Sequence, residues 1–359
     1  MIVRRLLVLF AALTASVFAS DAPVSFAQVD PNYEIQFPRD EGSHPNFRTE
    51  WWYVTGWIEN DRNEPMGFQV TFFRNRPGTD ESNPSRFALR QVLFAHAAVS
   101  DPKIGALLRD EKSARAGFGL AEASESALDV HIDDWSLRTS GEGYVAQIAA
   151  KEFAMQLQLS PTERPMLQGE RGVSRKGAHV ESASHYYSMP GLKVSGTLSV
   201  RGKSMRVHGL AWLDHEWSST YMESGAQGWD WTGINFDDGS ALMAFRMRSS
   251  RGVLWASAST REAHSTTVHT FQPQQVRWRA LRRWRSPRTG NEYPIEWEIV
   301  VQDRRIVLRP LMDDQENDSR ASTGTVYWEG AVRAFDESNR SIGRGYLELT
   351  GYGQRLEMQ

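Results

Sequence analysis

The sequence predicts an all-β protein made of two small antiparallel β-barrels packed together. Three observations favour this fold: short segments of alternating polarity, almost no long amphipathic helical pattern, and an internal repeat of one hairpin motif. At 359 residues, 40% of them hydrophobic, the chain is longer than one typical domain. It contains no cysteine, so packing alone must stabilise each barrel.

Ten segments have the length and composition of β-strands. They are rich in Val, Ile, Thr, Tyr, Phe and Trp, and turn-forming clusters such as Asp237-Asp238-Gly239 separate them. The segment 110–128 is rich in Ala, Ser and Gly, and we expect a loop with one helical turn there. The predicted strands are 50–58, 67–74, 87–98, 153–159, 192–200, 207–213, 229–235, 240–247, 294–301 and 345–350.

The internal repeat indicates how the strands are grouped. Residues 52–56 (WYVTG) and 229–233 (WDWTG) share Trp, Thr and Gly at the same spacing. Each segment begins a hairpin that ends in Phe-Arg, at 73–74 and at 245–246. The repeat therefore predicts two similar β units, each long enough for a small barrel with a ligand-sized interior. The predicted domains are 33–215 and 220–359.

Residues 1–27 have the pattern of a secretory signal peptide. A short basic segment precedes an apolar run at 6–19, and small-x-small cleavage sites end at Ala19 and Ala27. The apolar run is short for a membrane span. We therefore expect a periplasmic or secreted protein with no stable membrane insertion after cleavage.

Composition and missing motifs exclude several functions. The formal charge of −3 argues against nucleic acid or an anionic membrane as the main partner. The absence of cysteine excludes thiol catalysis and Cys-bound metals, and neither a Gly-x-Ser-x-Gly elbow nor a phosphate or dinucleotide loop is present. No metal and no cofactor are expected. Four scattered histidines are interpreted as structural, namely His44, His96, His179 and His208.

The segment 212–217 (WLDHEW) places three ionisable side chains between two tryptophans. Alternate residues of a strand share a face, so Trp212, Asp214 and Glu216 point one way. His215 points the other way, and the three ionisable groups cannot bind one metal ion. A face that mixes a large ring with carboxyls fits a cavity wall or the contact between two barrels. It is either an interdomain hydrogen-bond network or a site where burial raises the pKa of a carboxyl, so that it carries a proton at neutral pH.

The first predicted strand and two aromatic elements supply further candidates. Arg48, Glu50 and Trp52 share one face, where an Arg–Glu pair would tie the end of the barrel. Tyr186 and Tyr187 each supply either a pocket phenol or a core side chain.

Trp229 and Trp231 lie on one face of a later strand. They fit core packing, and their ring faces would also stabilise a cationic intermediate.

Six motifs carry a resemblance to a known family over most of the mature chain. They are FPRDEGSHPNFRTEWWYVTGWIE (37–59), SHYYSMPGLKVSG (184–196), GLAWLDHEWSS (209–219), GWDWTGINFDDGSALMAFRMR (228–248), VYWEG (326–330) and GYLELTGYG (345–353). The chain resembles the secreted AttH-like branch of the carotenoid 1,2-hydratase (hydroxyneurosporene synthase) superfamily. The resemblance implies lipocalin-like barrels, an apolar ligand of isoprenoid or lipid type, and ABC exporter components as partners.

The resemblance also implies a role for Asp214. In the hydratases, the aspartate of a Tyr-Leu-Asp motif is the proton donor to a terminal carbon–carbon double bond, and Asp214 of Trp-Leu-Asp matches it. We therefore predict a hydratase-type hydro-lyase that adds water by acid catalysis, with Glu216 tuning or relaying the proton. The alternatives are a non-enzymatic lipid carrier or exporter accessory protein, and a hydrolase of an apolar ester. The predicted ligand-binding residues are Trp52, Tyr187, Trp212, Trp229 and Trp231, and the supporting residues are Arg48, Glu50 and His215.

Overall fold

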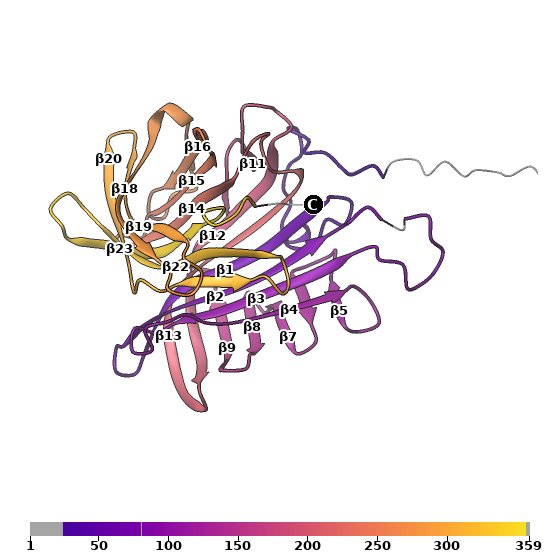
Figure 1. Cartoon of the computed structure of the whole chain (residues 1–359), viewed down its shortest axis with the longest axis horizontal. Helices are drawn as coiled ribbons and strands as arrows, with labels where there is room; N and C mark the ends of the chain where they lie inside the picture. Colours follow the sequence, from indigo (N-terminus) through magenta and orange to yellow (C-terminus); the bar gives the residue numbers. More distant parts are fainter. Residues whose placement is uncertain (1–23, 80, 357–359) are drawn as a thin grey trace, which may run out of the picture.

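The computed structural model describes residues 24–79 and 81–356, which form two antiparallel β-sheets side by side (Figure 1). The predicted signal peptide lies mostly outside these residues. In the described part of the chain, no helix has the length and apolar character to cross a membrane. Within residues 24–79 and 81–356, the two helical turns are η1 (Arg39–Glu41) and η2 (Pro273–Gln275). The predicted all-β fold of two barrel-like units is confirmed.

The first sheet curls until its two ends approach each other. Its strand order is β4-β3-β2-β1-β13-β12-β9-β8-β7-β6-β5, with β10 and β11 added beside β12. Contacts of β3 and β4 with β6 bring the ends together. Its strands are β1 (Thr49–Asn60), β2 (Pro65–Asn75), β3 (Val92–Ser100), β4 (Leu108–Arg115), β5 (Ala121–Ala123), β6 (Asp129–Ile132), β7 (Trp135–Ser140), β8 (Gly143–Ala149), β9 (Phe153–Ser160), β10 (Met166–Leu167), β11 (Val173–Arg175), β12 (Ala183–Val200) and β13 (Lys203–Thr220).

The second sheet has the order β17-β16-β15-β14-β23-β22-β20-β19-β18, with β21 beside β22. In both sheets the first hairpin pairs with the last strand, which in turn pairs with the strand before it. The order of strands therefore repeats, as the hairpin motif predicted. The strands are β14 (Gly228–Phe236), β15 (Ala241–Ser249), β16 (Gly252–Arg261), β17 (His269–Phe271), β18 (Val276–Arg285), β19 (Glu292–Val301), β20 (Arg304–Pro310), β21 (Glu316–Ser319), β22 (Thr325–Phe335) and β23 (Ser341–Leu349).

The repeated motif itself does not occupy equivalent faces in the two sheets. Trp52 lies in the core of the first barrel, whereas Trp229 packs against the cluster between the barrels. Because successive strand residues alternate between faces, an offset of one residue exchanges inside for outside. The motif correctly indicated two related hairpins, but its two tryptophans are not structural counterparts.

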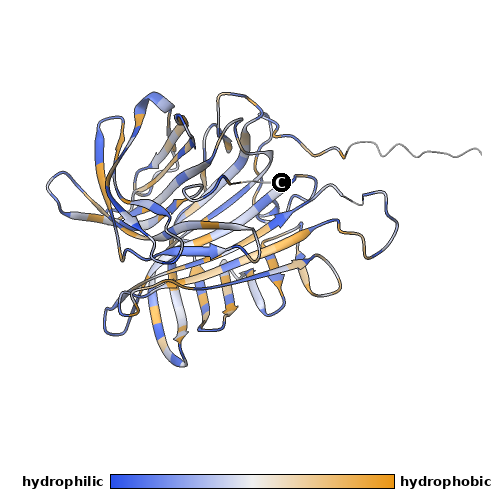
Figure 2. Ribbon diagram, viewed as in Figure 1, coloured by the Kyte–Doolittle hydropathy of each residue, from blue (hydrophilic) through white to orange (hydrophobic). Residues whose placement is uncertain are grey.

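Three hydrophobic clusters stabilise the molecule. One fills each barrel, and the third lies between the two barrels, where β1, β12 and β13 face β14 and β23. Figure 2 shows the alternation of hydrophobic and hydrophilic residues along the strands that produces these faces. We call the third cluster the seam. Its members include Tyr53, Trp57, Tyr186, Trp212, Tyr221, Trp231, Met243, Phe245 and Tyr346.

Two predicted segments differ from the structure. The expected loop at 110–128 contains most of β4 and all of β5. β4 forms the end of its sheet, and most of its side chains are only partly buried, so its polar sequence carries little strand signal. The strand predicted from residue 87 begins at Val92, and Phe87 is 69% exposed.

Candidate functional site

The segment 212–217 lies in the middle of β13, between β1 and β12. Asp214 is opposite Tyr53 on β1 and Ser188 on β12. Asp214 and Glu216 face the seam, and His215 faces the interior of the first barrel. The ionisable groups therefore lie on two opposite faces of β13, as the alternation of strand residues predicted.

The Asp214 carboxyl is enclosed by three hydrogen-bond donors. Ser188 Oγ donates to Oδ1 over 2.5 Å and Trp212 Nε1 donates to the same oxygen over 2.6 Å. Tyr186 donates its hydroxyl to Oδ2 over 2.7 Å, and Trp231 Nε1 donates to that hydroxyl over 3.0 Å. The second barrel therefore reaches the carboxyl through the Tyr186 hydroxyl.

The environment of Asp214 favours its protonated form. Burial raises the pKa of Asp214 to about 7, although the hydrogen bonds from Ser188, Tyr186 and Trp212 act in the opposite direction. The nearby Glu216 carboxyl adds to the rise. Oδ1 has two donors and Oδ2 has one, so we assign the exchangeable proton to Oδ2. A group with this pKa can both give and take a proton at neutral pH.

Glu216 lies next to Asp214 on the same face and has a cationic partner. Lys176 Nζ is 2.6 Å from Glu216 Oε1, and both side chains are buried. Lys176 also lies over the rings of Tyr186, Tyr221 and Phe245, at 4.7–5.0 Å from their centroids. Burial raises the pKa of Glu216, and the ion pair with Lys176 limits this rise.

The second barrel contributes two more carboxyls to the seam, Glu329, which is buried, and Glu348, which is partly buried. Trp229 Nε1 donates to Glu348 Oε2 over 2.9 Å. Burial raises the pKa of Glu348 to about 7, with the Trp229 hydrogen bond opposing and Asp214 adding to the shift. Burial and the neighbouring Glu348 raise the pKa of Glu329 well above its usual range. Acidic groups from both barrels with raised pKa values thus surround one aromatic seam.

The aromatic side chains of the seam pack closely. The Trp231 ring lies 5.2 Å from that of Tyr53 and 6.3 Å from that of Trp212, both near edge-to-face. A Cβ added at Gly233 would lie 2.9 Å from an atom of the Trp212 ring. Glycine at this position therefore lets the two barrels approach.

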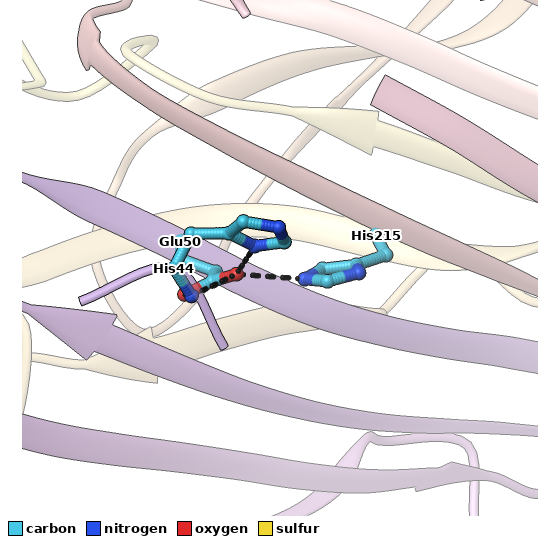
Figure 3. Close-up of side chains that lie close together, drawn as sticks. All are labelled: His44, Glu50 and His215. Atoms are coloured by element: carbon cyan, nitrogen blue, oxygen red, sulfur yellow. Dashed lines mark hydrogen bonds and ion pairs between the residues drawn. The ribbon is translucent and has the colours of Figure 1, made fainter. Parts of the chain in front are cut away.

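The opposite face of β13 belongs to a separate network inside the first barrel (Figure 3). His44 Nδ1 and His215 Nε2 lie 2.7 and 2.9 Å from Glu50 Oε1. Arg74 Nε donates to Glu50 Oε2 over 2.8 Å. Burial opposes the charge of Glu50, but His44 and Arg74 hold its pKa well below the usual range. Burial also opposes the charge of His44, yet Glu50 and Asp40 raise the pKa of this imidazole.

The ligand-type atoms of His44, Glu50 and His215 lie within 4.8 Å of one another, as in many metal sites. Here both imidazole nitrogens point at the same carboxylate oxygen (Figure 3), and the other oxygen is paired with Arg74. A divalent ion would have to break these contacts and lie beside a guanidinium. We therefore interpret the cluster as an ion-pair network that stabilises the barrel end.

The predicted site residues separate into two groups. Trp212, Trp229 and Trp231 are at the seam with Asp214 and Glu216. Trp52 and Tyr187 lie in the core of the first barrel, together with Glu50 and His215. The structure does not bring the two groups together, because alternate residues of β1 and β12 face different cores.

The structure replaces the predicted Arg48–Glu50 pair and separates the two candidate tyrosines. The arginine that pairs with Glu50 is Arg74, from the neighbouring strand β2, whereas Arg48 lies 4.2 Å from the ring centroid of Phe26. Of the two tyrosines proposed for a pocket, Tyr186 contacts Asp214, whereas the Tyr187 hydroxyl lies 3.3 Å from His215 Nδ1.

The sequence did not reveal several residues of the seam and of the network around Glu50. Glu348 was detectable, because alternation along GYLELTGYG places it on one face with Tyr346. His44 was treated as a scattered histidine, and only the fold brings it to Glu50. Lys176 comes from the irregular segment after β11 and had no strand signal.

Two cavities open near the second barrel, and Asp214 lines neither of them. One, of about 490 Å³, is lined by residues of β16 and β18, including Trp255 and Trp278. The other, of about 1020 Å³, lies between the barrels and shares Met243 with the seam.

Comparisons with known proteins agree with this architecture. A candidate AttH protein from Nitrosomonas europaea, known from its crystal structure, is 47% identical, with a TM-score of 0.86 over 92% of this chain and 100% of that chain. Kievitone hydratase from Nectria haematococca is 14% identical, with a TM-score of 0.69 over 92% and 97% of the two chains, a likeness in fold alone. No curated protein matched the chain. The sequence model of the AttH-like family matches residues 28–352, and the chain therefore belongs to the AttH-like family.

Proposed function

We propose that the protein is a hydratase-type enzyme that adds water to a carbon–carbon double bond of an apolar ligand, with Asp214 as the acid. The observation that carries this proposal is the buried Asp214 carboxyl, whose pKa is raised to about 7 between aromatic rings of two barrels. A fold-level neighbour is itself a hydratase, so a scaffold of this kind is compatible with hydration chemistry.

The reaction requires one proton and one water. Asp214 Oδ2 gives its proton to one alkene carbon, which leaves a carbocation on the other carbon and a carboxylate on the enzyme. Water then forms a bond to the cationic carbon and returns a proton to Asp214, so the acid is regenerated. Ring faces of Trp212 and Trp231 would stabilise the cation, while Ser188 and Tyr186 would hold the carboxylate in place.

The place of action belongs to the same proposal. We infer that the chain is exported to the periplasm or secreted, because a basic segment and an apolar run precede the family domain. An apolar ligand fits this inference, because envelope lipids and their derivatives are available there.

The test uses a panel of apolar alkenes in water enriched in heavy oxygen, followed by mass spectrometry of the products. The proposal predicts that the wild type incorporates one labelled water into at least one alkene, and that Asp214→Asn retains the fold but loses this activity. Asp336→Asn, on the surface next to Arg340, is the matched control and should behave as the wild type. Equal turnover by Asp214→Asn would overturn the assignment of the acid.

A second function is favoured by one specific observation. The cavity of about 1020 Å³ between the barrels is not lined by Asp214. A carrier needs such a cavity for its ligand but needs no acid in it. In that case the protein carries an apolar ligand, alone or as an accessory of an exporter. Ligand that co-purifies with the protein and is recovered unchanged by both wild type and Asp214→Asn would favour this carrier function.

A further inference from the structure

The cavity between the barrels has two walls from different sheets. One wall is β11 with the turn before it, and the other is the outer face of β15, β16 and β17. Residues 28–32 complete it on the N-terminal side. With a volume of about 1020 Å³, this cleft is at the upper end of sites that bind drug-sized molecules.

Polar atoms without partners are concentrated in the walls of this cleft. Trp255, Ser257 and Ser259 alternate along β16 and therefore share one face. The indole nitrogen of Trp255 and both serine hydroxyls are buried and have no hydrogen-bond partner in the described chain. On the opposite wall, Arg175 Nε is also buried and has no hydrogen-bond partner in the described chain. Ser259 is only 1% exposed, so solvent does not compensate for the missing bond.

All four of these groups can donate a hydrogen bond. The indole N–H and the guanidinium N–H can only donate, and the two hydroxyls can donate or accept. A ligand group that suits them all is therefore an acceptor with several lone pairs.

The charge inside the cleft indicates that this acceptor is anionic. Arg175 is half-buried, and its terminal nitrogen donates to the carbonyls of Gly177 and Ala178. Its guanidinium lies 4.9 Å from the Trp255 ring centroid, and it forms no salt bridge among residues 24–79 and 81–356. Glu170 and Glu181 also line the cleft, but they are exposed at its rim, where water screens their charge.

The remainder of the lining is suited to an apolar body. Met243, Val268 and Phe271 come from the second barrel, and Val173 and Ala183 from the first. Met243 and Val268 also join the cleft to the aromatic seam.

We propose that this cleft binds an amphipathic molecule with a carboxylate-type anionic head and an apolar body. The head accepts hydrogen bonds from Arg175 and Trp255, with the serines of β16 beside them. The body lies against Met243 and Phe271. This proposal rests on the proposed function only in assuming that the ligand is mostly apolar. It adds the chemical type of the head group and the place where the head group binds.

The test compares decanoate with decan-1-ol, which have the same chain but differ in charge, by isothermal titration calorimetry on the full-length mature protein. The wild type should bind decanoate more tightly than decan-1-ol. Because a hydrogen bond to a charged group is stronger than one between neutral groups, Arg175→Met should weaken the binding of decanoate about 10-fold or more. Binding of decan-1-ol should change less than about threefold, because its hydroxyl carries no charge.

Two further variants complete the design. Trp255→Phe keeps an aromatic ring but removes the indole N–H, and it should weaken the binding of decanoate several-fold. Arg206→Met removes an exposed arginine that pairs with Asp61 on the surface, and it should bind both compounds as the wild type does. Thermal melting confirms that each variant is folded.

The outcomes separate this proposal from the catalytic one. If Asp214→Asn binds decanoate normally but turns over no alkene, both proposals stand. If it binds normally and also turns over alkene, the catalytic proposal fails and the cleft remains. The cleft proposal is overturned if the wild type binds no decanoate, if it prefers decan-1-ol, or if Arg175→Met and Arg206→Met have the same effect.

Discussion

Asp214 on β13 and Glu50 on the paired strand β1 are both buried carboxyls, yet their neighbours shift their pKa values in opposite directions. Asp214 has only neutral donors against it, so burial dominates and the pKa rises to about 7. Glu50 is buried as well, but His44 and Arg74 hold its pKa well below the usual range. One residue is thus suited to proton transfer and the other to an ion pair.

The pKa of Asp214 predicts a pH-dependent stability that needs no substrate. Between its ordinary value of 3.8 and about 7, the folded protein holds a proton that the unfolded chain has released. Stability should therefore fall as the pH rises through this window, by roughly 4 kcal/mol from this group. Asp214→Asn, which is uncharged at every pH, should remove this loss. Urea unfolding of both proteins from pH 4 to pH 8 checks it, and parallel curves would contradict the raised pKa.

Glu50 should contribute to stability rather than to chemistry. Glu50→Gln leaves the Arg74 guanidinium and the His44 imidazole buried without their carboxylate, so we expect a loss of about 3–5 kcal/mol in the free energy of unfolding. Glu59→Gln removes a surface pair with Arg344 and should cost less than about 1 kcal/mol. Denaturant unfolding at neutral pH distinguishes the two. A small effect of Glu50→Gln would show that the network is not stabilising.

At the scale of the element, β13 shows what alternation can and cannot predict. The division of Asp214 and Glu216 from His215 followed from the period of a strand alone. Alternation could not predict which side chains of the partner strand β12 share these faces. The reason is that β12 contains register shifts between Ala183 and His185 and between Met189 and Leu192. A single shift exchanges the faces, which is why Tyr186 rather than Tyr187 meets Asp214.

The repeated hairpin motif likewise predicted how the strands are ordered but not which faces its side chains occupy. Its composition predicted two related sheets, and the strand orders agree. Its motif could not reveal which face each tryptophan occupies, because that depends on where each hairpin begins relative to its barrel. Arg74 and Arg246 nevertheless pair with acids directly across their hairpins, namely Glu50 and Asp230.

The segment before β1 predicts the position of signal cleavage. Ala27 N donates to Asn46 O over 2.9 Å, Ser219 Oγ donates to Ala27 O over 2.5 Å, and Arg48 covers the ring of Phe26. Because these contacts require residues 26 and 27 in the mature protein, we expect cleavage after Ala19 rather than after Ala27. N-terminal sequencing of exported protein should begin at Ser20. A mature protein that begins at Gln28 would contradict this expectation.

At the scale of the whole molecule, the seam explains why two barrels are joined. Neither barrel alone encloses Asp214: the donors Ser188 and Trp212 come from the first barrel, while Trp231 of the second holds the Tyr186 hydroxyl. Trp57 Nε1 of the first barrel also donates to Gly345 O of the second over 2.9 Å. The proposed acid and the proposed cleft both depend on this junction, which the sequence indicated only as a mixed face.

The protonation of Asp214 at neutral pH is the central claim, and infrared difference spectroscopy tests it most directly. The carbonyl stretch of a protonated carboxyl that is present in the wild type and missing from Asp214→Asn reports this group alone. Our account predicts that this signal titrates with a midpoint of about 7. A midpoint near the ordinary value of 3.8 would mean that Asp214 is ionised at neutral pH and is not the proton donor.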